Sequence, residues 1–108
     1  MGSAGFVSYD AFEEKVKAFA NDLARMLISK NADYADGTNA LSGFESTIGL
    51  QPAEVWHVYF AKHVKALERY VRDGQLATEP LRGRAIDVAA YAFLLTLIDE
   101  ARTDANGR

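Results

Sequence analysis

Apolar residues recur three and four positions apart along most of this chain, and that spacing is what most limits how it can fold. One such stripe falls in residues 10–30, a second in 52–73 and a third in 80–101. The spacing places apolar side chains on one face of an α-helix. Two prolines occur, Pro52 and Pro80, and each stands where a stripe begins, at a favoured first helical position. The pattern predicts an all-α fold with three long helices.

The ends of these helices are indicated by capping residues. The first helix should begin near Ser8 or Asp10, because Asp10 and Glu13 have the spacing of a capping box. It should end near Lys30. The second helix should stop before Gly74, since glycine readily adopts the left-handed conformation that ends a helix.

A long polar segment, residues 31–49, separates the first two long helices. Connections between bundle helices are usually about 2–8 residues long. Leu41 and Phe44 are the apolar residues that could anchor a short helix across 39–47. Because long ordered loops on a helical scaffold often bind ligands, we expect functional residues here.

The length of 108 residues allows one domain. We expect a disordered leader or tag at 1–7, a single all-α domain at 8–103 and a frayed tail at 104–108. The absence of cysteine excludes disulfides and thiolate metal sites. No apolar stretch is long enough to cross a membrane. A net charge of -3 without a basic block argues against general nucleic-acid binding.

The third long helix is apolar nearly all round, with Val88, Ala92 and Leu95 on the side away from Asp87. A helix of this kind is either central in its fold or at a subunit interface. Three long helices and one short one also cannot easily cover their own apolar faces. We therefore expect a helical bundle completed by homo-oligomerisation.

Asp87 interrupts the apolar run 85–95, where it should face the core with Tyr91, Leu94 and Ile98. Burying an unpaired carboxylate costs several kcal/mol. The predicted helix that precedes it in the sequence, residues 52–73, offers a partner, His63, which lies on an apolar stripe. A short connection makes these helices antiparallel neighbours. His63 and Asp87 are therefore either a structural pair that fixes helix register or the polar centre of a functional site.

Three cations lie near this pair in the sequence. Lys62 precedes His63, and its long stem could simply extend to solvent. Arg82 and Arg84 stand at the start of the third long helix, where the helix dipole favours acids. Free N–H groups at a helix start attract anions, so cations placed there are suited to binding phosphate.

Three segments resemble parts of one family of small, mostly phage-encoded proteins, the nucleotide modification associated domain 1 family. Residues 30–36 (KNADYAD) and 39–44 (NALSGF) resemble its K-x-x-D-Y opening. Residues 60–67 (FAKHVKAL) resemble its middle helix, and 84–92 (RAIDVAAYA) resemble its closing D-x-x-x-Y-A helix. The resemblance covers roughly residues 25–100 and implies an all-α protein that acts on or binds nucleotides.

The closing segment also resembles the last catalytic helix of MazG-type all-α nucleotide pyrophosphohydrolases. Those enzymes use E-x-x-E and E-x-x-D motifs to hold Mg²⁺ on nucleotide phosphates. Here Arg84 replaces the first acid of the second motif, and Lys62 and Lys65 stand near the first motif. Asp87 is then the sole matching acid, which makes a poor Mg²⁺ site. Cations in place of acids favour direct phosphate binding over MazG-type hydrolysis.

We therefore expect a phage-type protein that binds a nucleotide or nucleotide-derived small molecule without a cofactor, in the cytoplasm of an infected or lysogenic bacterial host. Binding could serve DNA-precursor metabolism or sequester a host nucleotide signal. Lysine and arginine would hold phosphates, and the polar loop would contact base or sugar. The predicted ligand-binding residues are Asp33, Tyr34, Asn39, Lys62, His63, Arg82, Arg84 and Asp87.

Two alternatives stay open. The first is a divergent metal-dependent nucleotide pyrophosphohydrolase, with Mg²⁺ held by the carboxylates of Asp33, Asp36, Glu45 and Asp87. The second is a helical interaction protein without a small-molecule site, in which every one of these polar residues is structural.

Overall fold

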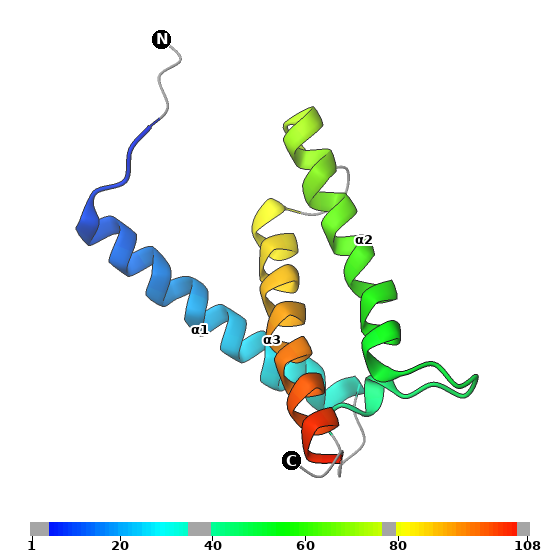
Figure 1. The fold of residues 1–108 in the computed structure, drawn as a ribbon. Helices are drawn as coiled ribbons and strands as arrows, with labels where there is room; N and C mark the ends of the chain where they lie inside the picture. The colour runs from blue at the N-terminus through cyan, green and yellow to red at the C-terminus, as the bar shows by residue number, and fades with distance from the viewer. Residues whose placement is uncertain (1–4, 35–39, 77–79, 106–108) are drawn as a thin grey trace.

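The computed structural model describes residues 5–34, 40–76 and 80–105, with the side chains of 31–34 excepted. Three long helices and one short 3-10 helix make up this part of the chain, and it contains no strand (Figure 1). They are α1 (Tyr9–Tyr34), η1 (Ser42–Phe44), α2 (Pro52–Asp73) and α3 (Leu81–Ala105). The all-α prediction is confirmed, and η1 lies inside the range expected for the short helix.

The first helix begins at the predicted position, directly after Ser8, and ends later than its sequence signals indicate. The Oγ of Ser8 accepts a hydrogen bond of 3.2 Å from the backbone N–H of Ala11, so Ser8 is the cap of α1. Asp10 therefore lies within the first turn instead of capping it. The prediction that the helix ends near Lys30 is wrong, because α1 continues one turn further to Tyr34.

The second helix has the predicted bounds. The backbone N–H of Gln51 donates to Oε1 of Glu54 at 2.9 Å, which satisfies a group that precedes the first helical turn. At the other end, Gly74 has a φ of 79°, a left-handed conformation that costs other residues more than glycine. Its N–H donates to the carbonyl of Tyr70 at 2.7 Å and closes the helix.

The third helix is the central one. It lies antiparallel to α2 and also contacts α1, so its nearly all-round apolar surface meets a helix on two sides (Figure 1). It begins directly after Pro80 and ends at Ala105, beyond the expected end at Ala101. Residues 104 and 105, expected in the tail, belong to the last turn of this helix.

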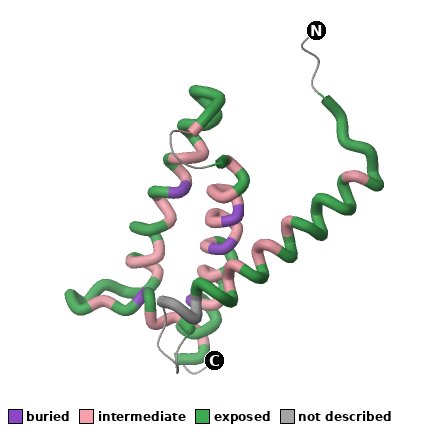
Figure 2. Tube along the Cα trace, turned by 180° about the vertical axis from the view of Figure 1, so that it is seen from behind, coloured by how far each residue is buried: buried purple, intermediate pink, exposed green. Residues whose placement is uncertain are grey.

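The core is small and centres on α3. The buried apolar side chains of the described residues come from η1 and α3, and purple segments mark them in Figure 2: Phe44, Ile86, Ala90 and Ile98. Next to this core, Trp56 stacks on Phe60 with ring centroids 4.6 Å apart. The indole N–H of Trp56 donates to the carbonyl of Tyr91 at 2.7 Å, which ties α2 to α3.

The helices are not equally covered by their neighbours. α2 and α3 lie side by side along most of their lengths, whereas the first half of α1 extends away from both (Figures 1 and 2). The second half of α1 runs back beneath α3 and meets the bundle there. Among the described helices, none has the length and apolar character needed to span a membrane.

Candidate functional site

A pocket of about 620 Å³ lies where the second half of α1 meets η1, α2 and α3. Each of these elements contributes one face to its wall, so the pocket exists only when all of them are assembled. Its lining residues are Met26, Leu27, Lys30, Ala40, Gly43, Phe44, Tyr59, Lys62, His63, Asp87, Ala90, Tyr91 and Leu94.

Helical spacing explains which side chains reach the pocket. On α1, Met26 and Lys30 are four residues apart and so lie on one face. On α2, Tyr59 and His63 have the same separation. α3 repeats the pattern, with Asp87, Tyr91 and Leu94 on a single stripe. The same helix faces thus carry apolar side chains where they form the core and polar side chains where they line the pocket.

His63 is the buried polar residue at the centre of this wall. Its Nδ1 lies 3.2 Å from Nη1 of Arg84 and 3.6 Å from Oδ2 of Asp87. The predicted contact between His63 and Asp87 is therefore made. The expectation that Asp87 faces the core is only partly right: its side chain is 32% exposed, and the buried positions of α3 next to it are Ile86 and Ala90.

The two distances at Nδ1 of His63 indicate how the ring is used. A guanidinium can only donate, and 3.2 Å is within hydrogen-bond range, so Arg84 donates to an Nδ1 without a proton. The 3.6 Å separation from Asp87 is too long for a hydrogen bond. Asp87 instead lies next to a polar centre to which Arg84 brings positive charge. In the tautomer that accepts this hydrogen bond, the proton lies on Nε2.

Two lysines give the pocket wall a positive character. Lys30 comes from the end of α1 and Lys62 from the middle of α2. Within the described part of the chain, neither ammonium group has an ion pair or hydrogen bond. Asp87 is the one acid among the described lining residues. A wall with two unpaired ammonium groups and one carboxylate is suited to an anionic ligand.

Aromatic side chains line the apolar part of the pocket. The ring of Phe44 lies 6.4 Å from that of Tyr59 and 6.3 Å from that of Tyr91. Tyr91 also lies 5.1 Å from the His63 ring. These separations are typical of tilted aromatic pairs that fix one another in place. The pocket therefore offers planar apolar surface beside its charged wall.

The structure brings together part of the predicted set of ligand-binding residues. Lys62, His63 and Asp87 line the pocket, and Arg84 lies against it through its hydrogen bond to His63. Arg82 does not belong to this group. Its Nη1 lies 2.6 Å from Oδ2 of Asp22 on α1, and its guanidinium carbon lies 5.6 Å from the centre of the Phe19 ring. Arg82 thus joins α1 to α3.

The remaining predicted residues come from the segment between α1 and α2. Asn39 and Asp36 lie outside the described residues. Asp33 and Tyr34, expected in a loop, belong to the last turn of α1, where the structure describes the backbone and not these side chains. Glu45 follows η1 and is exposed. In the described part of the chain, no three histidine or acidic side chains gather as a metal site would require.

Among the charged and aromatic lining residues, the predicted set lacks Lys30, Phe44, Tyr59 and Tyr91. A signal existed for Lys30, since it continues the stripe of Leu23 and Leu27 at helical spacing and ends it with a charge. Helical spacing alone did not mark the three aromatic residues, because core and pocket aromatics have the same spacing; Phe44 and Tyr91 do belong to the segments that resemble the family. No known protein family, curated protein or solved structure matches this chain.

Proposed function

We propose that this chain binds a nucleotide or a nucleotide-derived small molecule in the pocket between α1, η1, α2 and α3. The proposal rests on two lysines, Lys30 and Lys62, that have no ion pair or hydrogen bond among the described residues, and on an aromatic wall in the same cavity. The ammonium groups would hold phosphate, and the planar base would lie against the aromatic side chains.

The pocket has the dimensions that such a ligand needs. Ligand pockets are typically about 300–1,000 Å³ and are mostly apolar, with a few convergent polar groups that fix orientation. A volume of about 620 Å³ falls inside that range. The convergent polar groups here are Lys30, Lys62, His63 and Asp87. A small molecule therefore fits this site better than a flat macromolecular surface would.

The two lysines and Asp87 carry opposite charges, so together they would determine how the ligand lies in the pocket. Asp87 would repel phosphate, so we place sugar hydroxyls or the amino groups of a base on its side of the pocket. Lys62 and Lys30 would meet the phosphates. Arg84 would act on His63, holding its ring so that the proton on Nε2 can be donated to a ligand acceptor.

The segments that resemble the nucleotide modification associated domain 1 family support the choice of ligand. Lys30 begins the first segment, Phe44 ends the loop motif, Lys62 is in the middle segment, and Asp87 and Tyr91 are in the closing one. All five line the same pocket although they are far apart in the sequence. Nucleotide binding of this kind would take place in the cytoplasm of a bacterial host, in DNA-precursor metabolism or in sequestration of a nucleotide signal.

Calorimetric titration with a panel of nucleotides, first in EDTA and then with Mg²⁺, tests the proposal. We expect binding in EDTA that weakens as salt is added, because phosphate contacts with lysine are screened. Lys62→Met should weaken binding by at least about tenfold, the size of a lost charge-assisted contact. The matched control is Lys65→Met, since Lys65 lies one turn away on α2 and does not line the pocket.

Two results would contradict the proposal. One is equal loss of affinity in the Lys62 and Lys65 variants, which would place the ligand elsewhere or make the attraction non-specific. The other is pyrophosphate release that requires Mg²⁺ and disappears in Asp87→Ala, which would favour the pyrophosphohydrolase alternative.

A further inference from the structure

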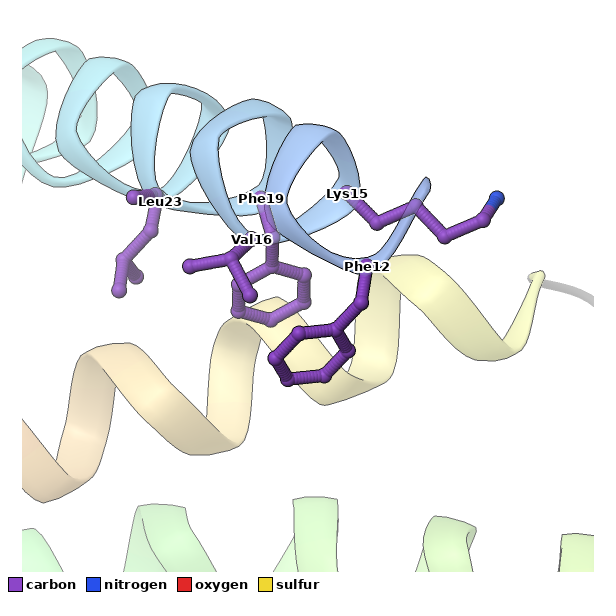
Figure 3. A pocket seen from close by; sticks show the side chains of 6 residues that line it. Phe12, Lys15, Val16, Phe19 and Leu23 are labelled. Carbon is purple, nitrogen blue, oxygen red and sulfur yellow. The ribbon is translucent and has the colours of Figure 1, made fainter. Parts of the chain in front are cut away.

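The first half of α1 presents an apolar face that no other described element covers. Phe12 is 57% exposed and Val16 is 49% exposed, although both lie on the stripe that packs further along the helix. Figure 3 shows their side chains together on one side of α1. They border a hollow of about 350 Å³ that is lined by α1 alone, by Phe12, Lys15, Val16, Phe19, Ala20 and Leu23.

The exposed surface of the chain is larger than that of a compact protein of the same mass. The chain exposes 8271 Å². A compact protein of 11.9 kDa exposes about 5,900 Å². The radius of gyration of this chain is 17.0 Å, whereas a compact domain of the same length has a radius of about 13 Å. Both quantities describe a chain that is more extended than a compact domain, because the first half of α1 projects away from α2 and α3 (Figure 1).

The excess is nearly three times the area that one subunit contributes to a typical interface. It amounts to about 2,300 Å², whereas a stable protein–protein interface buries about 800 Å² from each partner. The small core points the same way. Four apolar side chains are buried among the described residues, which is little hydrophobic stabilisation for a chain of this length. Covering the α1 face would add to the core itself.

We propose that a second copy of this chain covers the apolar face formed by Phe12, Val16 and the part of Phe19 left exposed beside Arg82, in a symmetric interface built on the first half of α1. A partner that completes a core must be present whenever the chain is synthesised, and another copy always is. Closed twofold pairs are the commonest soluble oligomers. Interfaces between identical subunits are also the more apolar kind, as this face is.

The interface would continue an existing contact. The same stripe of α1 meets α3 at Phe19, beside Arg82, and then reaches the pocket at Met26 and Lys30. A second copy would extend that packing toward the start of α1 and would leave the pocket at the other end. The inference therefore does not depend on the proposed ligand, and the two can fail separately.

Sedimentation of the full chain without nucleotide provides the first test. We expect the wild type at micromolar concentration to sediment as at least twice its 11.9 kDa mass. Phe12→Glu should weaken self-association by at least about tenfold, because the carboxylate would lose its water in the interface. The matched control is Ile28→Glu. Ile28 is 74% exposed on the same helix but lies about 160° round from Phe12, so its variant should associate normally.

A monomeric wild type would overturn the inference, as would equal association of the Phe12→Glu and wild-type chains. Cysteine cross-linking keeps the test decisive if Phe12→Glu fails to fold. The chain has no cysteine, so single substitutions report without background. Phe12→Cys, Val16→Cys or Phe19→Cys should form disulfide-linked pairs under mild oxidation in dilute protein, and Ile28→Cys should not. Cross-linking at Ile28 alone would place the interface on the opposite face and refute the proposal.

Discussion

The two halves of α1 follow one apolar stripe but have different surroundings. The second half packs beneath α3 and supplies Met26, Leu27 and Lys30 to the pocket. The first half carries equally apolar residues, Phe12 and Val16, into solvent. The apolar spacing therefore predicts that one face of the helix is buried, and does not predict which element or partner buries it.

This difference separates two roles within one helix. At the covered end, four elements converge and bring charged and aromatic side chains into a cavity, which is where we place ligand binding. At the uncovered end, Phe12 and Val16 are about half-exposed among the described residues, which is where we place the second copy. Mutations at the two ends should therefore differ in what they change and in whether concentration matters.

The largest expected effect comes from the core of the packed region. Ile86→Ala removes a buried side chain of α3 and should lower the free energy of unfolding by about 2–5 kcal/mol. Phe12→Ala should act differently, because its side chain is half-exposed within one chain. Its cost should arise through association and should shrink as the protein is diluted. Urea denaturation at several protein concentrations measures both.

A similar response of Ile86→Ala and Phe12→Ala to protein concentration would contradict the contrast between the packed core and the first half of α1. A concentration-independent loss for Phe12→Ala would mean that its ring stabilises the single chain. A negligible loss for Ile86→Ala would mean that α3 is not the centre of the core.

A smaller effect is expected at the polar centre of the pocket. Asp87→Ala should cost about 1 kcal/mol or less, because the carboxylate is one-third exposed and its contact with His63 is long. Breaking a fully buried pair would cost about 3–5 kcal/mol. Thermal or urea unfolding distinguishes the values. A loss in the higher range would make Asp87 a structural partner of His63 and would weaken its assignment to the ligand.

The smallest effect is expected at the ion pair between Arg82 and Asp22, which joins α3 to α1. Arg82 and Asp22 are both partly exposed, so Arg82→Ala should cost between about 0 and 1 kcal/mol, and less at high salt. Nucleotide affinity should not change, since Arg82 is engaged with α1 outside the pocket. Titration of the variant checks this. A marked loss of affinity would restore Arg82 to the ligand-binding set that the sequence predicts.

Much of the fold follows from local signals. The proline at Pro52 and the glycine at Gly74 mark the ends of α2 correctly, because capping depends on neighbouring residues alone. The end of α1 was missed since Asn31, Asp33 and their neighbours are polar residues of modest helix propensity. The structure nonetheless continues the helix by one turn to Tyr34.

The site was predictable only in part, for a different reason. His63 and Asp87 could be paired because a polar residue on an apolar stripe stands out, and antiparallel neighbours bring such residues together. The role of Arg82 depends on where α1 crosses α3, and crossing positions are set by side-chain packing rather than by sequence spacing. The same holds for Lys30 and Tyr59, which meet only because α1 passes η1 and α2 at that level.

The central claim is that a phosphate-bearing ligand occupies the pocket at the packed end of the molecule. Nuclear magnetic resonance of isotope-labelled protein, titrated with nucleotide in EDTA, tests it most directly. We expect amide signals around Lys62 and Asp87 to shift, and those around Phe12 and Arg82 to stay in place. Shifts centred on the first half of α1 and Arg82, or no shifts at millimolar nucleotide, would contradict it.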